Sequence, residues 1–205
     1  MPKQFGEEER RAIDGRLREV AAELFARGGT RGVSVEELAS SAAISKGSFY
    51  SFYPTKEALL FSVVRDEERR LQRPVREELE ALDPPTRDGV FDILQRSILA
   101  VESNPVLRRM LDVREFDRIM RNVPAQYHTG HRDEDRDVLG RVFAQWQKAG
   151  LIRPDPPESL VGAVRSLYLL TLHRRELGED TFDAARSQLL RLVVDGLFCG
   201  RGGPS

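Results

Sequence analysis

The chain has 205 residues, a length that fits one large domain or two smaller ones with cores of ordinary size. Hydrophobic residues make up 40% of the chain and charged residues 32%, which excludes wholesale disorder and a membrane-embedded protein. Because 32 Lys and Arg residues balance 33 Asp and Glu residues, the net charge of −1 excludes a basic coat over the whole surface, and affinity for nucleic acid would need a local motif.

The cysteine content fits a reducing compartment, and the hydropathy shows neither a targeting segment nor a membrane span. The single cysteine, Cys199, cannot form an internal disulfide or a multi-cysteine zinc site. Residues 1–12 lack the apolar stretch of a signal peptide, and the most apolar segment, 160–172, contains Arg165 and is shorter than the ~20 residues that span a bilayer. We therefore expect a cytoplasmic protein with no membrane partner.

The spacing of apolar residues is helical wherever it is legible, which predicts an all-α fold of about nine helices. The first helix is expected over residues 8–27, followed by a glycine pair that supplies a C-terminal stop. Its apolar residues lie three or four positions apart and share one face. They are Ile13, Leu17, Val20, Ala21, Leu24 and Phe25.

Two short helices follow the first one. Ser34 and Glu37 have the spacing of a capping box and predict the start of the second helix. After a break at Ala43, Ser45 is placed to cap a third short helix, which Pro54 ends. The second and third helices have the length and spacing of a helix-turn-helix, whose second helix enters the major groove of DNA.

Six longer helices are expected in the rest of the chain. The fourth begins at Thr55, and we expect a kink or break near residues 70–74 because Pro74 lies inside its pattern. The other five are expected around Phe91–Val101, from Asn104 through Met120, around Leu139–Trp146, from Asp155 to about Leu177, and from Asp180 to Gly200. Residues 122–137 are the longest polar stretch and predict a solvated loop. His128, His131 and Asp133 in that stretch lack the spacing of a helical metal site, so no metal is expected.

The third helix carries the groups best suited to DNA. Its first residues can donate to or accept from base edges, Gly47 allows close backbone approach, and side chains one or two turns further on can reach phosphates. The candidate DNA-binding residues are Ser34, Ser45, Lys46, Gly47, Ser48, Tyr50, Phe52 and Lys56. Residues 27–56 hold four Lys and Arg against two acids, a net charge of +2 and a modest footprint for DNA.

The run LFARGGTRGVSVEELASSAAISKGSFYSFYPTKEALL, residues 24–60, resembles the signature of the TetR (tetracycline-repressor) family of bacterial regulators. The matched features are Leu24-Phe25, Gly29, Ser34-Val35, Leu38-Ala39, Ser45-Lys46-Gly47, Tyr50, Lys56-Glu57 and Leu59. The resemblance implies a homodimer that binds a palindromic operator in double-stranded DNA and usually acts as a repressor. It also implies a DNA-binding domain over residues 1–54 and a C-terminal ligand-binding and dimerisation domain over residues 55–205, where a small-molecule inducer would bind.

Two positions depart from the family pattern. Ala43 stands where the family commonly has glycine, and a positive φ there would cost about 1 kcal/mol. Phe52 stands where the family often has His or Tyr, and its side chain cannot donate to a phosphate.

The last two long helices are apolar on more than one face, and one monomer core is expected to cover only one face of each. We therefore predict that both helices pack against their copies in a four-helix bundle between two protomers. The residues assigned to this interface are Val161, Val164, Leu167, Leu190, Val194 and Leu197.

A ligand pocket is expected among the middle helices. The candidates to line it or to orient a polar ligand are Phe91, Arg109, Met110, Arg114, Phe116, Trp146, Tyr168 and His173, although aromatic and methionine residues at helical spacing are also common in plain cores. No nucleophile beside a base, phosphate-binding glycine loop or HExxH pattern occurs, so neither an enzyme nor a cofactor is expected. The alternative is an all-helical small-molecule-binding or enzymatic protein that has kept a decayed helix-turn-helix.

Overall fold

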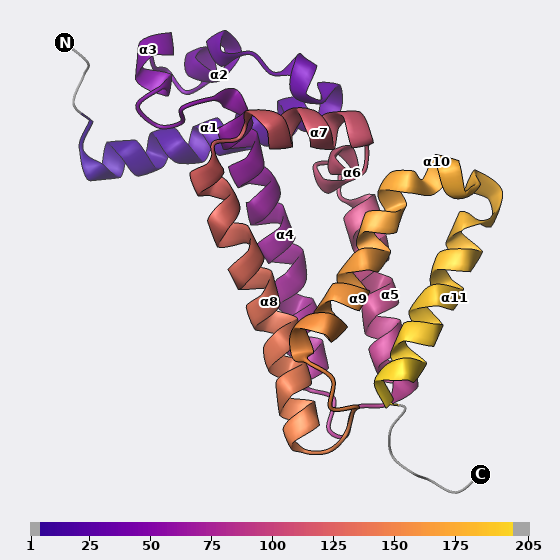
Figure 1. The fold of residues 1–205 in the computed structure, drawn as a ribbon. Helices are drawn as coiled ribbons and strands as arrows, with labels where there is room; N and C mark the ends of the chain where they lie inside the picture. Colours follow the sequence, from indigo (N-terminus) through magenta and orange to yellow (C-terminus); the bar gives the residue numbers. More distant parts are fainter. Residues whose placement is uncertain (1–4, 199–205) are drawn as a thin grey trace, which may run out of the picture. The chain divides into compact units, whose positions relative to one another are not determined.

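The computed structural model in Figure 1 describes residues 5–198, without the side chains of residues 128–138 and 175. Eleven α-helices, two 3-10 helices and no strand make up the regular structure of that range, which confirms the all-α prediction. The α-helices are α1 (Glu7–Gly28), α2 (Val35–Ser41), α3 (Lys46–Phe49), α4 (Lys56–Glu80), α5 (Arg87–Ser103), α6 (Leu107–Met110), α7 (Val113–Asn122), α8 (Ala125–Lys148), α9 (Pro157–Leu170), α10 (Arg174–Leu177) and α11 (Glu179–Phe198). The 3-10 helices are η1 (Thr30–Gly32) and η2 (Thr171–His173).

The chain forms two compact units that are not continuous in sequence. Among the described residues, unit 1 contains residues 5–69 and 103–128, and unit 2 contains residues 70–102 and 129–198. Unit 1 therefore holds α6 and α7 together with α1, α2, α3 and the first half of α4. This division by compactness differs from the functional division expected after residue 54, because a segment from the middle of the chain joins the N-terminal helices.

The predicted helix starts in unit 1 are confirmed by their capping hydrogen bonds. The Ser34 hydroxyl accepts from the backbone N–H of Glu37 at 3.1 Å, and the Ser45 hydroxyl accepts from the N–H of Ser48 at 3.0 Å. The Thr55 hydroxyl oxygen likewise accepts from the N–H at the first turn of α4 at 3.0 Å. Each oxygen satisfies a donor that the helix itself leaves unpaired.

The expected break at Pro74 was wrong. Helix α4 runs without interruption through this residue to Glu80. Proline removes one backbone donor, but the ladder on both sides remains, and ion pairs from Arg73 to Glu77 (2.9 Å) and from Arg76 to Glu80 (3.9 Å) lie along the turns beyond it.

The predicted polar loop over residues 122–137 was also wrong for most of its length. The backbone is helical from Ala125 onward, as part of α8. Polarity excludes burial rather than helicity, and residues such as Gln, Glu and Arg are good helix formers. The side chains of His128, His131 and Asp133, which we weighed as metal ligands, lie outside the described residues.

Two other helices are interrupted where one continuous helix was expected. The segment after Asn104 divides into α6 and α7, because Asp112 starts a new helix by accepting from the N–H of Arg114 at 2.8 Å. The segment from residue 157 to 177 divides into α9, η2 and α10.

Within unit 1, α6 reaches the connection between α1 and α2, which we call the α1–α2 turn (residues 26–33). The guanidinium of Arg109 donates to the backbone carbonyl of Ala26 at 3.0 Å and to that of Arg27. These carbonyls belong to the last turn of α1, where no helical N–H follows to pair them. Arg109 therefore caps the C-terminus of α1 from a position more than 80 residues away in sequence.

Helix α7 holds the next part of the same turn. One carboxylate oxygen of Glu115 accepts from the backbone N–H of Thr30 at 2.7 Å and from the Thr30 hydroxyl, while the other oxygen accepts from Arg118 at 3.0 Å. The carboxylate lies directly against Gly29, whose φ of 63° and ψ of −165° are accessible essentially to glycine alone. A Cβ atom at that position would lie 2.9 Å from the Glu115 carboxyl carbon.

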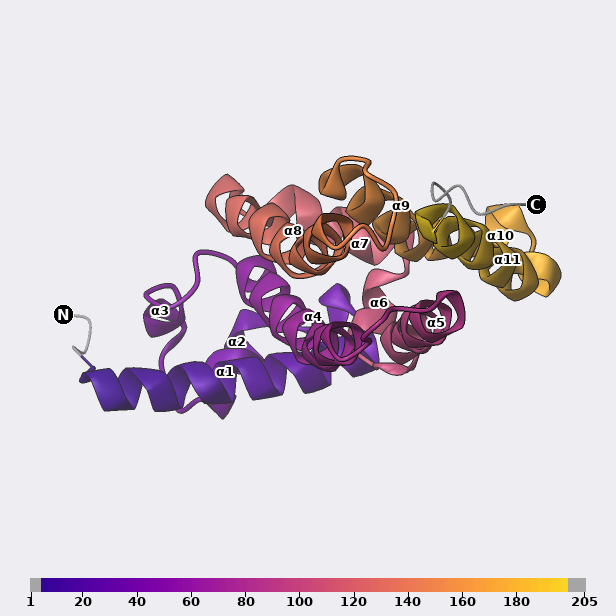
Figure 2. The same cartoon turned by 90° about the horizontal axis from the view of Figure 1, so that it is seen from below.

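The core of unit 2 is formed by apolar side chains from α5, α8, α9 and α11, with Leu79 from the end of α4. Helices α9 and α11 pack against each other (Figure 2). All six residues assigned to a dimer interface lie in this core and are at most 6% exposed. The argument that one chain could not cover them was therefore wrong, because α5 and α8 supply the second covering surface. The large apolar side chains that these two helices leave exposed are Leu169, Leu189 and Leu192.

The geometry at the α1–α2 turn makes a prediction about two adjacent glycines. We expect Gly29→Ala to lower the free energy of unfolding by about 1 to 3 kcal/mol, because it combines a strained backbone conformation with a contact against Glu115. Gly28→Ala is the matched control: nothing lies within 4 Å of its Cβ position, and alanine favours a helical residue. Urea unfolding followed by circular dichroism measures both variants. Equal stabilities of the two variants would contradict this account of the turn.

Candidate nucleic-acid interface

Helices α2 and α3 turn one face toward the core of unit 1 and leave the other open. Leu38 and Ala39 of α2 and Phe49 of α3 are almost completely buried. Between the helices, Ala43 takes the positive φ expected from its place in the turn, at 56°. The backbone N–H of Ile44 then donates to the carbonyl of Ala39 at 2.9 Å and closes the turn. This packing fixes which side chains of α3 point outward.

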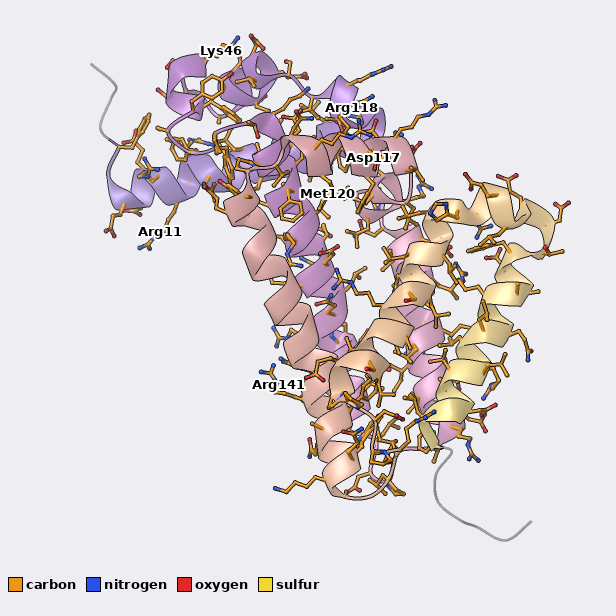
Figure 3. The ribbon with its side chains drawn as sticks, viewed as in Figure 1. Arg11, Lys46, Asp117, Arg118, Met120 and Arg141 are labelled. Atoms are coloured by element: carbon orange, nitrogen blue, oxygen red, sulfur yellow. The ribbon has the colours of Figure 1, made fainter. Side chains whose placement is uncertain are left out.

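The first turn of α3 brings four of the predicted DNA-binding residues together, from Ser45 to Ser48. The first three of them are exposed, and Lys46 is labelled on the ribbon in Figure 3. The Ser45 and Ser48 hydroxyl oxygens lie 2.8 Å apart in a hydrogen bond. A Cβ atom at Gly47 would meet only the Ser45 hydroxyl oxygen, at 3.8 Å, so the fold itself does not demand glycine there.

Tyr50 and Ser34 border this turn. Tyr50 is 50% exposed, and its ring packs edge-on against Phe49 with centroids 5.4 Å apart, which orients the phenol outward. Ser34 is exposed, but its hydroxyl is used to cap α2. A ring anchored on a buried neighbour holds its hydroxyl with little loss of conformational freedom, as a phosphate contact would need.

Lys56 lies half-buried at the start of α4, and its ammonium is already engaged. It donates to the backbone carbonyls of Thr30 at 2.9 Å and Val33 at 2.7 Å. An ammonium has three hydrogens, so one remains for the predicted phosphate contact. The structure thus gives Lys56 a task that the sequence did not reveal, which is to hold the α1–α2 turn together with Arg109 and Glu115.

Phe52 packs against the start of α1. Its ring centroid lies 5.8 Å from that of Phe5 and 4.5 Å from the guanidinium carbon of Arg10. Arg10 also donates to the backbone carbonyl of Ser51 at 3.2 Å. Sequence reasoning missed this exposed cation beside the end of α3, because a separation of 41 residues leaves no local signal of the contact.

The eight predicted ligand-binding residues are divided between the two units. Unit 1 contains Arg109, Met110, Arg114 and Phe116, and unit 2 contains Phe91, Trp146, Tyr168 and His173. Arg109 is engaged by the α1–α2 turn. In unit 2, Phe91 and Trp146 belong to the apolar core, and the Tyr168 hydroxyl is hydrogen-bonded to Ser97 at 2.5 Å. Burial raises the pKa of Tyr168, so this phenol stays neutral.

Unit 2 has a cavity of about 300 Å³ between α5 and α11. It is lined by Gln95, Ile98, Leu99, Glu102, Asp183, Arg186, Ser187 and Leu190, none of which the sequence analysis assigned to ligand binding. The buried guanidinium of Arg186 on its wall is paired with Glu102 and lies 3.1 Å from Asp183. Arg186 and Glu102 lie 84 residues apart in sequence. The spacing of apolar residues therefore could not reveal their ion pair.

The part of the chain that the structure describes contains neither a cluster of metal ligands nor a membrane-spanning helix. No three His, Cys, Asp or Glu side chains among the described residues are grouped so that they could hold an ion. Within residues 5–198, no helix is long and apolar enough to cross a membrane.

Comparison with known proteins places this architecture among DNA-binding regulators. Residues 17–63 match the family model described as bacterial regulatory proteins, tetR family. The HTH-type transcriptional regulator UidR of Escherichia coli (strain K12) is 30% identical over 191 residues, which cover 89% of this chain and 91% of UidR. The HTH-type transcriptional repressor KstR2 of Rhodococcus jostii is 27% identical over 186 residues, covering 88% of this chain and 89% of KstR2.

Solved structures share the fold. A TetR-family transcriptional regulator from Pectobacterium atrosepticum superposes with a TM-score of 0.72 at 16% identity, covering 96% of this chain and 99% of its own. A second structure, described as a TetR-family transcriptional regulator from Mesorhizobium loti, gives a TM-score of 0.64 at 18% identity over 94% of this chain and 97% of its own. With a relative as similar as UidR matched over nearly its whole length, the chain belongs to the TetR family of transcriptional regulators.

Proposed function

We propose that the protein is a ligand-responsive transcriptional repressor. It binds a palindromic operator in double-stranded DNA as a homodimer in the cytoplasm, and a small-molecule inducer releases it. DNA binding belongs to residues 1–54, supported by α6 and α7, and ligand binding and dimerisation belong to residues 55–205. The observation that carries the proposal is the outward face of α3, with Lys46 and Tyr50 exposed opposite the buried Phe49. The relative KstR2 is named a repressor, which supports repression rather than activation.

The first turn of α3 supplies groups for base edges. The Lys46 ammonium can donate to guanine O6 or N7, and the Ser45 and Ser48 hydroxyls can donate or accept. Tyr50 and Arg10 flank this turn with donors for phosphates, which position a protein on DNA without reading its sequence. The arrangement therefore combines base reading at its centre with phosphate contacts at its edges.

Dimerisation is assigned to the surface that α9 and α11 leave exposed. Leu189 and Leu192 of α11 are 42% and 58% exposed, and Leu169 of α9 is 47% exposed. Gly162 and Gly196 lie on the same two helices with nothing within 4 Å of their Cβ positions, so a partner backbone can approach closely there. A dimer that binds a palindromic operator must hold its two α3 helices ~34–36 Å apart, so that they can enter successive major grooves.

Two routes connect the proposed ligand-binding part with α3. One is α4, which begins at Lys56 in unit 1 and continues into unit 2. The other is the α6–α7 segment, which follows α5 of unit 2 and bonds the α1–α2 turn through Arg109 and Glu115. We propose that an inducer changes DNA affinity by displacing α4 and this segment together, because both contact the same turn.

The DNA-binding proposal predicts a selective effect of Lys46→Ala. We expect the variant to lose about 1 to 3 kcal/mol of discrimination at one or two base pairs of a duplex selected from a random pool, because a base-edge contact is removed. Lys148→Ala, at the end of α8 in unit 2, is the control for loss of one lysine charge. Fluorescence anisotropy with the selected duplex and single-base variants of it measures both. A wild-type protein that neither selects a duplex nor is retained on mixed-sequence DNA would instead support the small-molecule-binding or enzymatic alternative.

The dimer proposal predicts that Leu192→Glu gives a monomer. A carboxylate placed in a dry interface costs several kcal/mol. Val113→Glu is the control, because it adds the same charge at an apolar residue of unit 1 that is 38% exposed. Sedimentation velocity at micromolar concentration distinguishes the two. A monomeric wild-type protein, or a Leu192→Glu variant that remains dimeric, would refute the assignment of this surface.

A further inference from the structure

Lys46, the residue best placed to read a base, is held by an acid on the neighbouring helix. Its ammonium nitrogen lies 2.5 Å from a carboxylate oxygen of Glu36, in the first turn of α2. Both side chains remain more than half exposed, at 55% and 64%. The hydrogen bond to Glu36 raises the pKa of Lys46, and the hydrogen bond to Lys46 lowers the pKa of Glu36, so both groups are charged at neutral pH.

The pair matters because α2, α3 and the turn between them contain no other cation. Lys46 is the sole Lys or Arg in residues 35–50, whereas Glu36 and Glu37 are both acidic. The cation that follows in sequence, Lys56, is bonded to backbone carbonyls. Helix α3 therefore presents its single positive charge in an ion pair with a carboxylate.

We propose that Glu36 is a specificity-determining residue. Its ion pair with Lys46 weakens the contacts of this lysine with phosphates on DNA of arbitrary sequence, but permits a hydrogen bond from the lysine to an acceptor on a base. The inference rests on the proposed DNA-binding function and adds a residue to it. Glu36 need not touch DNA for this effect, because it acts through the lysine that it holds.

The physical basis is the different charge of the two competing DNA acceptors. Non-specific affinity comes from cations that replace counterions at phosphates, and a lysine paired with a carboxylate adds little to that count. A phosphate that approaches Lys46 also approaches the Glu36 carboxylate, and the two anions repel each other. Guanine O6 and N7 are uncharged acceptors, so Lys46 can bond them with one hydrogen while another stays on Glu36. The pair thus penalises backbone binding more than base binding.

The test compares two acids that differ in one contact. Glu36→Gln and Glu37→Gln each remove one negative charge from the exposed first turn of α2, but Glu36 is the one bonded to Lys46. On sheared mixed-sequence DNA at about 0.1 M salt, we expect Glu36→Gln to bind about five- to tenfold more tightly than wild type and to steepen the salt dependence by about one unit. The affinity of Glu37→Gln for the same DNA should increase clearly less. The affinity of Glu36→Gln for a duplex selected from a random pool should increase less than its affinity for mixed-sequence DNA. The variant therefore discriminates less well than wild type between the selected duplex and mixed-sequence DNA.

A double-mutant cycle separates the pair from general electrostatics. In a Lys46→Gln background, the additional Glu36→Gln change should increase the affinity for mixed-sequence DNA no more than the Glu37→Gln change does. An increase in affinity from Glu36→Gln that is the same with and without Lys46, or equal to the increase from Glu37→Gln, would overturn the inference. The proposed DNA-binding function would remain intact. A wild-type protein that binds neither DNA would instead overturn the proposed function itself.

Discussion

The hydrogen bonds that α6 and α7 make to the α1–α2 turn are the constraint on which the N-terminal unit depends. The last carbonyls of α1 and the N–H of Thr30 have no partners within their own helices, and Arg109 and Glu115 supply them. The ammonium of Lys56 accounts for two further carbonyls of the same turn. The turn is therefore ordered by three charged side chains, which add to the direct packing of α1 against α2.

The parts of the fold that local chemistry decides could be read from the sequence. Ser34, Ser45 and Thr55 mark helix starts because a short hydroxyl side chain can accept from the backbone donors left unpaired there, and all three make such bonds. The break expected at Pro74 did not occur, because α4 continues with helical turns on both sides of the proline. The break before Asp112 was missed, because apolar spacing alone does not distinguish one helix from two in succession.

The candidate site was predictable to the extent that it is local. The exposed start of α3 follows from the motif, whereas the bond between Glu36 and Lys46 was not predicted. The hydrogen bonds of Arg109 to α1 could not be predicted, since its partners lie more than 80 residues away in sequence. The same limit explains the dimer residues: a doubled apolar face on α9 shows that two surfaces are covered, but not whether the second belongs to the same chain.

The distance in sequence between α7 and the α1–α2 turn has a consequence for synthesis on the ribosome. Glu115 follows Thr30 by 85 residues, so the N-terminal helices leave the ribosome well before the carboxylate that completes their turn. At typical rates of ~5–20 residues per second, the delay is on the order of ten seconds. During that interval Gly29 lacks the side chain that packs against it, and the backbone N–H of Thr30 lacks its acceptor. A nascent chain therefore completes its α1–α2 turn only after more than half of the protein has been made.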